Sequence, residues 1–437
     1  MNYVQTVIRA LATSMGARAL SMGLRFITVC LFPFWLSPEQ VGFAAVLMAL
    51  INLIIAFIDL GFGTALIKEK NVTERMGRSV FTLLIAIATG VTAVCLLFTD
   101  TICAQFSLPA IALLIALFAI PFSVFAIVPN ALLQRDLRFT SLALRDLLGE
   151  IAFSTVAITL AILGFHLTCV AWALLIQRIV RWLVASLSVS FAPRLTCNRA
   201  DIRQLLSFSL FQLGNISITQ IANRIDTFLL SVFLPPAALG FYSQAQQLTV
   251  FPIQSMSGAV TNVFFASFSK INADAQKIRE LFLKMMRGVI FFALVLFACL
   301  YPAVGLMPAI YGDAWLPSVE IARLLSFSVP LFAAATLEGI LISIGGEKRR
   351  LVAALSRALI MTGGLLLLFL AFPDFASPNA VAILVFIASA TAFALNFSFL
   401  IKKIGIRRRD ARIWFKPAAL GILLSLISII LTRLFLV

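Results

Sequence analysis

Ionisable side chains occur inside the long apolar stretches of this 437-residue sequence. The ones that lie deepest in these stretches are Arg25, Arg178, Arg224, Asp226 and Glu338. A charged side chain that faces lipid at the middle of a bilayer costs about 2.5–3.5 kcal/mol on insertion scales. We therefore expect these side chains to face a bundle interior or a wet cavity. There an arginine fork can bind phosphate or carboxylate, and a carboxylate can exchange protons.

Polar side chains recur at helical spacing in two consecutive apolar stretches. Over residues 206–234 the polar positions are Gln212, Asn215, Thr219, Asn223 and Asp226. Over residues 238–266 they are Gln247, Gln254, Ser257 and Thr261. Residues three, four or seven apart share one face of a helix, so the sequence predicts two polar stripes. Amides and hydroxyls beside arginines suit a sugar phosphate better than a lipophilic cation, although the same groups can simply pair across a bundle.

A second group of charges lies nearer the ends of the apolar stretches, where long side chains can snorkel toward water. These residues are Arg18, Asp59, Glu150, Arg323 and Arg357. In the two groups together arginines outnumber carboxylates, and this surplus favours an anionic cargo.

The candidate roles follow from side-chain chemistry. The candidates for binding and translocating such a cargo are Arg25, Arg178, Arg224, Asn215, Thr219, Asn223, Gln247 and Gln254. The candidates for ion coupling are Asp59, Asp226 and Glu338, because an intramembrane carboxylate can change its protonation.

Residues that would support catalysis or a metal are not grouped in the sequence. The one histidine, His166, stands in a short turn, and the six cysteines show no metal-binding or disulfide spacing. A phosphate-binding loop of the ATPase type is absent, and the loops are too short for a catalytic domain. We therefore expect no enzymatic activity, no metal and no cofactor.

The composition excludes the ordinary soluble classes. Hydrophobic residues make up 62% of the chain and charged residues 12%, with a formal net charge of +16. Soluble domains average about 45–50% apolar and about 25% charged residues. In a membrane protein a basic excess marks the cytoplasmic loops, so we expect no nucleic-acid partner.

The predicted fold is an all-α polytopic membrane protein. A bilayer core of about 30 Å needs about 20 apolar residues in a helix. A window of that length predicts thirteen spans, at 14–36, 41–65, 79–98, 108–133, 145–165, 168–191, 206–234, 238–266, 285–307, 317–345, 350–372, 378–401 and 415–436. Loops rich in Lys and Arg alternate with loops that contain neither, which predicts a cytoplasmic N-terminus.

An internal repeat predicts the domain organisation. The segment LSPEQVGF (36–43) returns as LPPAALGF (234–241), and each copy precedes a long apolar stretch. Six predicted spans separate the copies, so the halves are expected to be parallel repeats of a transporter fold. The expected domains are a six-helix lobe over 1–197, a second six-helix lobe over 198–403, and an extra helix within 404–437.

Six segments carry a resemblance to a known family. They are LSPEQVGFAAV (36–46), DLGFGTALIKEK (59–70), VPNALLQRDLRF (128–139), NRIDTFLLSVFLPPAALGFYSQAQQL (223–248), VFFASFSKI (263–271) and YGDAWLPSVEIARLLSF (311–327). Through them the chain resembles the polysaccharide-transporter branch, and especially the WzxC-like (Wzx) flippases, of the multidrug/oligosaccharidyl-lipid/polysaccharide (MOP) superfamily.

The resemblance implies a flippase of the bacterial inner membrane. Such a protein moves undecaprenyl-diphosphate-linked oligosaccharide repeat units across the membrane by alternating access, for exopolysaccharide or other surface-polysaccharide biosynthesis. A proton or sodium gradient is the implied energy source. The expected partners are the lipid-linked oligosaccharide, membrane lipids, a polysaccharide polymerase and a chain-length regulator.

Two alternatives belong to other classes. The first is an ion-coupled exporter of small amphipathic molecules from the multidrug branch, for which an acidic cavity is expected. The second is a role without transport, as a membrane scaffold or an integral glycan polymerase. The short loops count against the polymerase.

Overall fold

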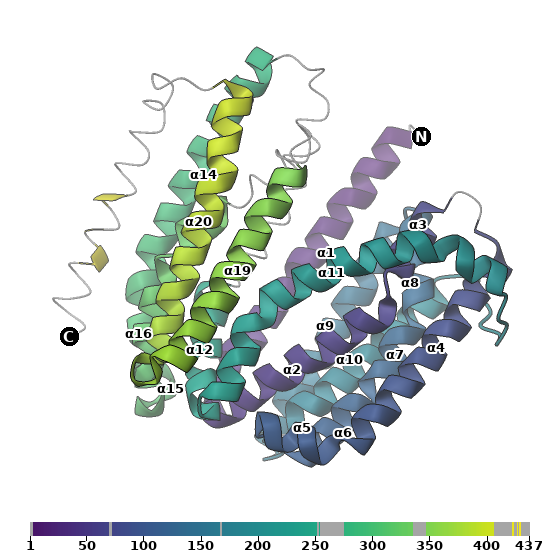
Figure 1. Cartoon of the computed structure of the whole chain (residues 1–437), viewed down its shortest axis with the longest axis horizontal. Helices are drawn as coiled ribbons and strands as arrows, with labels where there is room; N and C mark the ends of the chain where they lie inside the picture. The colour runs from purple at the N-terminus through teal and green to yellow at the C-terminus, as the bar shows by residue number, and fades with distance from the viewer. Residues whose placement is uncertain are drawn as a thin grey trace. The chain divides into compact units, whose positions relative to one another are not determined.

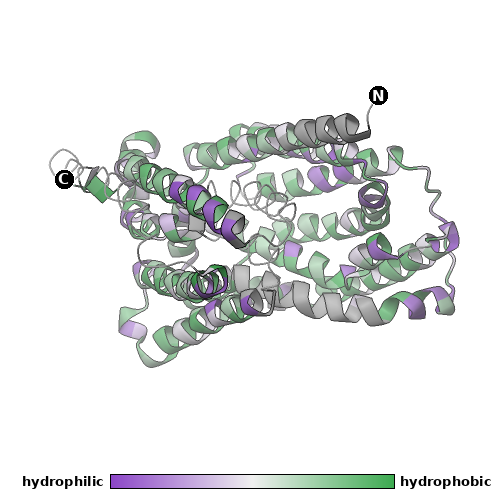
Figure 2. Cartoon of the chain, turned by 90° about the horizontal axis from the view of Figure 1, so that it is seen from above, coloured by the Kyte–Doolittle hydropathy of each residue, from purple (hydrophilic) through white to green (hydrophobic). Residues whose placement is uncertain are grey.

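Helices joined by turns and short loops make up the described part of this computed structural model, and no strand occurs in that part (Figure 1). The described residues are 3–69, 72–166, 168–250, 253, 275–334 and 347–405, with a few more between 422 and 429. The predicted all-α class is therefore confirmed. The chain divides into two compact units, residues 1–232 and 233–437. Apolar residues predominate along the helices, as a membrane-spanning protein requires (Figure 2).

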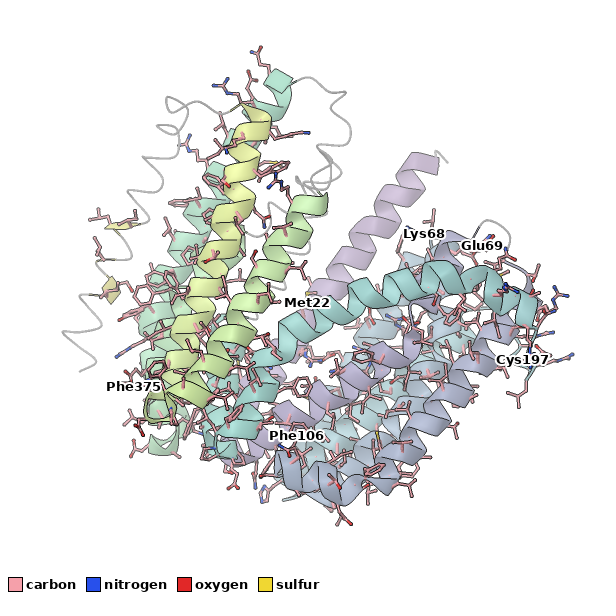
Figure 3. All side chains as sticks on the ribbon, viewed as in Figure 1. Met22, Lys68, Glu69, Phe106, Cys197 and Phe375 are labelled. Atoms are coloured by element: carbon pink, nitrogen blue, oxygen red, sulfur yellow. The ribbon has the colours of Figure 1, made fainter. Side chains whose placement is uncertain are left out.

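The first unit consists of helices joined by short connections. They are α1 (Tyr3–Leu31), α2 (Pro38–Asp59), α3 (Phe62–Lys68), α4 (Glu74–Leu97), α5 (Thr99–Phe106), α6 (Ala110–Leu117), α7 (Ala119–Phe125), α8 (Ile127–Arg135), α9 (Phe139–Ile162), α10 (Thr168–Leu187) and α11 (Arg199–Phe233), with a 3-10 turn at Phe32–Phe34. Helix α9 packs against α1 and α10, and α10 also contacts α2. Lys68 and Glu69 lie toward one end of this unit and Phe106 at the other (Figure 3).

Two spans of the first unit are broken, and each break has a local cause. The span Ala110–Arg135 is divided into α6, α7 and α8. Pro121 and Pro129 lack the N–H that would bond to a carbonyl four residues earlier, which interrupts the helix at Phe118 and Ala126. The second break separates α2 from α3, where Leu60 and Gly61 both adopt left-handed backbone angles, with φ of 49° and 77°.

The second unit carries the remaining described helices. They are α12 (Pro236–Thr249), α14 (Ala275–Ala303), α15 (Met307–Tyr311), α16 (Leu316–Ser326), α17 (Val329–Ala334), α19 (Glu347–Ala371) and α20 (Pro378–Ile404), with 3-10 turns at Val304–Leu306, Asp313–Trp315 and Pro373–Phe375. Helix α16 packs against α12 and α20, and α19 runs along α20. Trp315, Tyr242 and Phe282 are the largest fully buried side chains of this unit.

Seven of the described helical segments are long and apolar enough to cross a membrane. They are Pro38–Asp59, Glu74–Leu97, Ala110–Arg135, Thr168–Leu187, Arg279–Tyr311, Val352–Ala371 and Pro378–Ile404. Each corresponds to one predicted span. Predicted spans 145–165 and 206–234 are also long helices, α9 and α11. Helix α9 is apolar but contains the three charged residues Arg145, Asp146 and Glu150. Parts of 238–266 and 317–345, and most of 415–436, lie outside the described residues, so the count of thirteen stays a prediction.

The two copies of the internal repeat start helices at the same point. In the first copy Pro38 is the first residue of α2, and in the second copy Pro236 is the first residue of α12. Proline suits this position because the first helical N–H has no partner within the helix. In the first copy Ser37 and Gln40 add a capping box, with bonds of 3.3 and 3.0 Å. The two six-helix lobes remain a prediction.

Helix α11 belongs to the first unit, beyond the predicted boundary at residue 197. Arg75 on α4 donates two hydrogen bonds of 3.1 Å to the carboxylate of Asp201, near the start of α11. Further along, the Ser209 hydroxyl donates to the Leu60 carbonyl that the α2–α3 break leaves available. Phe228 then packs against Phe106, with ring centroids 6.3 Å apart. These contacts, made at three points along α11, attach it to the helices that precede it in the first unit.

Candidate functional site

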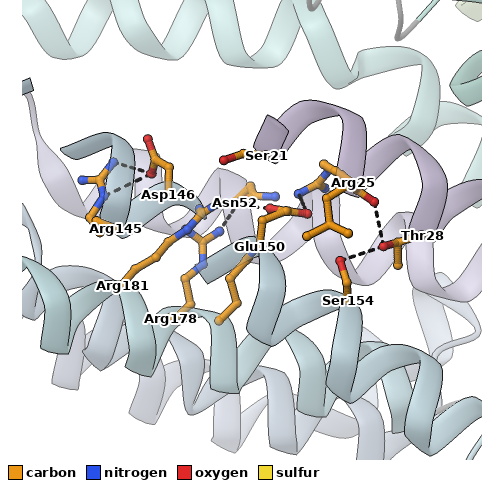
Figure 4. A network of polar contacts seen from close by, with 12 residues as sticks. Ser21, Arg25, Thr28, Asn52, Arg145, Asp146, Glu150, Ser154, Arg178 and Arg181 are labelled. Carbon is orange, nitrogen blue, oxygen red and sulfur yellow. Dashed lines mark hydrogen bonds and ion pairs between the residues drawn. The ribbon is translucent and has the colours of Figure 1, made fainter. Parts of the chain in front are cut away.

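A buried polar network joins α1, α2, α9 and α10 inside the first unit (Figure 4). Its centre is Glu150 on α9, which is 2% exposed. Two groups on α10 donate to its Oε2 atom: the Gln177 amide at 2.9 Å and the Arg181 guanidinium at 3.3 Å. From α1, the Arg25 guanidinium forms an ion pair with Oε1 at 3.7 Å. One carboxylate therefore interacts with two cations from different helices.

Arg178 has a neutral partner. Its guanidinium donates a hydrogen bond of 2.7 Å to Oδ1 of Asn52 on α2. The amide nitrogen of Asn52 donates to the Met48 carbonyl at 2.7 Å, which orients the amide oxygen toward α10. Within the described part of the chain Arg178 forms no ion pair, and its buried Nε has no hydrogen-bond partner. A partly buried cation that lacks a counter-charge is costly, so an anion that reaches Arg178 gains a strong interaction.

A glycine creates the space in which Arg181 reaches Glu150. Gly149 is buried on α9, and a Cβ atom built there would lie 2.5 Å from Cγ and 2.7 Å from Nε of Arg181. The Arg181 side chain therefore passes directly over the Gly149 backbone. Any larger residue at this position would displace Arg181.

Arg25 is the most accessible member of the ion pair with Glu150. Its side chain is 28% exposed, whereas that of Glu150 is 3% exposed. The guanidinium lies over the ring of Phe153, 5.7 Å from the centroid. One turn further along α1, Thr28 donates a 2.7 Å hydrogen bond to Ser154 on α9. The hydroxyl pair holds α1 against α9, so Arg25 is both positioned and partly open.

The network carries a surplus of positive charge. Arg145 and Asp146, 2.6 Å apart, form a neutral pair at one side of it. Glu150 neutralises one of the remaining arginines, Arg25, Arg178 and Arg181, which leaves a net charge of two positive units. The arrangement suits a divalent anion or two adjacent phosphates.

The structure brings together two of the predicted anion-binding residues, Arg25 and Arg178. Gln247 lies partly buried on α12 in the second unit. Asn215, Thr219, Asn223 and Arg224 belong to α11, but their side chains lie outside the described part. Gln254 and Glu338 lie outside the described residues altogether.

Two of the predicted ion-coupling carboxylates lie in the described part. The Oδ1 atom of Asp59 accepts a 3.0 Å bond from the N–H of Gly63, so Asp59 caps α3 at the helix break. Asp226 on α11 is 6% exposed and accepts a 2.8 Å bond from the N–H of Thr227. Both carboxylates therefore have a local structural role in addition to any role in coupling.

Sequence reasoning placed Glu150 near a span end, where it could snorkel, and that interpretation is wrong. The side chain is buried because Gln177 and Arg181 on α10 and Arg25 on α1 satisfy it. Arg181, Gln177 and Asn52 were not predicted as site residues. The i, i+4 spacing of Gln177 and Arg181 on one apolar helix was the available signal.

Comparison with known proteins finds relatives that are named for polysaccharide biosynthesis and transport. A family model described as "Polysaccharide biosynthesis protein" matches residues 35–320. Teichuronic acid biosynthesis protein TuaB of Bacillus subtilis is 28% identical over 281 residues, which are 62% of this chain and 57% of that protein. Succinoglycan biosynthesis transport protein ExoT of Rhizobium meliloti is 26% identical over 331 residues, 74% and 66% of the two chains. The matched part thus spans less than two thirds of the length of these relatives.

Solved structures show the same fold. The lipid II flippase MurJ, in an inward closed conformation, superposes with a TM-score of 0.75 at 16% identity, covering 98% of both chains. A MOP superfamily transporter from Pyrococcus furiosus gives a TM-score of 0.64 at 17% identity, covering 91% of this chain and 95% of that one. The fold of this chain is therefore that of MOP superfamily transporters.

Proposed function

The chain belongs to the family of polysaccharide biosynthesis proteins, and from this premise we propose that it is a flippase for a lipid-linked oligosaccharide. The resemblance to the polysaccharide-transporter branch of the MOP superfamily is confirmed by the family match and the fold. The proposed cargo is an undecaprenyl-diphosphate-linked repeat unit that is needed for exopolysaccharide or other surface-polysaccharide biosynthesis. The proposed location is a bacterial inner membrane, with the N-terminus in the cytoplasm.

The observation that carries this proposal is the positive surplus of the buried network. A diphosphate diester has a negative charge on each phosphate, which matches the two uncompensated units. The arginine fork binds phosphate oxygens through paired N–H donors. Within the described part of the chain, Arg178 offers a half-buried guanidinium that forms no ion pair, and Arg25 offers a partly exposed one.

Residue roles follow from accessibility and partners. Arg25 makes the first contact with the diphosphate because its side chain is partly exposed and forms no hydrogen bond with Glu150, and Arg178 receives the phosphate next. Arg224 on α11 supplies a further cation. The amides and hydroxyls of Asn215, Thr219, Asn223, Gln247 and Gln254 line the sugar path.

Glu150 is the resting counter-ion of Arg25 in this proposal. Arg25 leaves Glu150 when phosphate binds and returns to it after release. The phosphate therefore neutralises Arg25 in the loaded state, and Glu150 neutralises it in the empty state. Asp59, Asp226 and Glu338 couple transport to a proton or sodium gradient by changing protonation or by binding the ion. Alternating access moves the cargo, and a polysaccharide polymerase and a chain-length regulator act on the product. Transport in this scheme needs neither a cofactor nor catalytic chemistry by the chain.

Reconstitution tests the proposal directly. The purified chain is placed in proteoliposomes with a fluorescent undecaprenyl-diphosphate oligosaccharide, and a membrane-impermeant quencher reports the outer-leaflet fraction over time. We expect faster exchange than in protein-free vesicles, and no exchange of a fluorescent phosphatidylcholine. If no flipping occurs with or without an imposed ion gradient, the proposal is wrong. If phosphatidylcholine exchanges as fast as the oligosaccharide lipid, the chain is a scramblase.

A multidrug exporter remains the alternative because a multidrug transporter of the superfamily also shares the fold, with a TM-score of 0.60 at 19% identity. The charge of the network decides between the two. Surplus arginines repel an organic cation and attract a diphosphate. Overexpression is therefore expected to leave the tolerance of cells to cationic drugs unchanged.

A further inference from the structure

Three helix ends meet at one end of the second unit. Phe282, Leu283 and Met286 near the start of α14 pack in one buried cluster with Leu400 and Ile404 at the end of α20. Near the start of α19, the guanidinium of Arg349 lies over the ring of Phe399 on α20, 5.7 Å from its centroid. The starts of α14 and α19 and the end of α20 therefore lie side by side.

Exposed cations are gathered at this end. We call the set Lys284, Arg287, Arg349, Lys402 and Lys403 the basic platform. Among the described residues none of these five forms an ion pair. The arrangement therefore leaves five positive charges facing solvent within a few helical turns of one another.

Three arginines near helix ends of the first unit are used differently. Arg75 and Arg78 bind the carboxylates of Asp201 and Glu74. Arg138 donates to the Ser188 carbonyl at 2.5 Å. A general bias of basic residues toward one side of the membrane would place both sets of charges there. The five residues of the platform differ from Arg75 and Arg78 in that they form no ion pair within the described part of the chain.

On each of the three helices, an exposed cation of the platform shares one helix face with an exposed apolar side chain. Arg287 is followed four residues later by Phe291, which is 39% exposed. Arg349 is followed three residues later by Val352, which is 48% exposed. On α20, Lys402 comes seven residues after Leu395, which is 40% exposed. These spacings keep cation and apolar group on the same stripe of each helix, with the cation nearer the helix end.

We propose that the basic platform binds the headgroups of anionic phospholipids, whose acyl chains lie against these exposed apolar side chains. A soluble anion would use the cations alone, whereas a phospholipid matches both the charges and the apolar stripes beside them. Clusters of Lys and Arg at the ends of membrane helices attract anionic lipids, at about 1 kcal/mol for each cation near the surface. The site is separate from the network around Glu150 and does not depend on the cargo.

A pair of variants with equal charge change tests the proposal. The platform variant is Arg287→Gln, Lys402→Gln and Lys403→Gln. The control variant is Arg194→Gln, Arg199→Gln and Arg203→Gln, which removes three exposed arginines from the 194–203 stretch of the first unit. Each full-length chain is placed in phosphatidylcholine nanodiscs, and binding of fluorescent phosphatidylglycerol is titrated. We expect the platform variant to bind about a hundredfold more weakly, about fivefold for each cation, and the control to bind as the unaltered chain does.

The possible results separate the explanations. Unchanged binding by the platform variant overturns the proposal, and equal weakening by both variants overturns it in favour of general charge attraction. Displacement of the lipid by inorganic pyrophosphate at low concentration would identify a site for soluble phosphate instead. If the two variants and the unaltered chain unfold at the same temperature in pure phosphatidylcholine, the substitutions have not disturbed the fold. If the triple variant unfolds, Lys402→Gln and Arg287→Gln alone are each expected to weaken binding about fivefold.

Discussion

Arg25 approaches Glu150 at 3.7 Å without forming a hydrogen bond, while Gln177 and Arg181 donate to the other oxygen of the same carboxylate. The Oε1 atom that faces Arg25 is buried and has no hydrogen-bond partner in the described part of the chain. Arg25 is thus the loosest of the three partners of Glu150. A competing anion can remove Arg25 from this carboxylate without breaking a hydrogen bond.

Replacing Glu150 by Gln is expected to strengthen anion binding while weakening the fold. The loss of the shared negative charge leaves Arg25 and Arg181 without a counter-ion, so unfolding should become easier by about 3 kcal/mol. Inorganic pyrophosphate should bind about tenfold more tightly because Arg25 is released. Isothermal titration and thermal unfolding of the purified chain in detergent measure both effects. Asp146→Asn is the control, since Asp146 pairs with Arg145, and weaker pyrophosphate binding by Glu150→Gln would contradict the exchange model.

Arg178→Gln is expected to reduce flipping without reducing the stability of the fold. The substitution removes a half-buried cation whose hydrogen-bond partner in the described part of the chain is the Asn52 amide, so the unfolding temperature should not fall. Flipping in proteoliposomes should nevertheless decrease about tenfold or more, because the phosphate loses a charged donor. Arg145→Gln is the matched control, since Asp146 already neutralises that arginine. If stability and flipping decrease together, Arg178 is structural.

Gly149→Ala is expected to disrupt the network because the added methyl group clashes with the side chain of Arg181. The added methyl group would lie 2.5 Å from Cγ of Arg181, and relief of that clash should cost about 1–3 kcal/mol. The same substitution in an Arg181→Ala background should have little further effect, because the clashing atoms are gone. Thermal unfolding of the four chains gives the coupling energy. Gly90→Ala on α4, where a Cβ meets nothing within 4 Å, serves as the control, and equal costs at Gly90 and Gly149 would refute the steric argument.

Substitutions of Asp59 are expected to distinguish capping from ion coupling. Asn accepts the bond from Gly63 as Asp does, so Asp59→Asn should keep the stability of the α2–α3 break, whereas Asp59→Ala should lose about 1 kcal/mol. If Asp59 also couples transport to a gradient, Asp59→Asn abolishes the stimulation of flipping by that gradient. Stimulation that persists in Asp59→Asn would remove this residue from the coupling candidates and leave its capping role.

Local sequence rules predicted the helices better than the contacts between them. Apolar length and helical periodicity identified the spans, and the cost of burying charge singled out Arg25 and Arg178. The same reasoning misjudged Glu150, whose partners lie on α1 and α10. Gly149 was also missed because its role is to leave space for a side chain that is distant in sequence. Such contacts depend on how the helices pack against one another. The periodicity of side chains along one helix does not show which helix it packs against.

The shared start of α2 at Pro38 and α12 at Pro236 is the trace expected of a gene duplication followed by fusion. The second copy has Pro235 and Ala238 at the positions of Ser37 and Gln40 in the first copy. The capping box is therefore present in the first copy, and at the start of α12 Pro235 forms no side-chain cap. The two copies thus share the proline that starts the helix, and they differ in the contacts that hold its first turn.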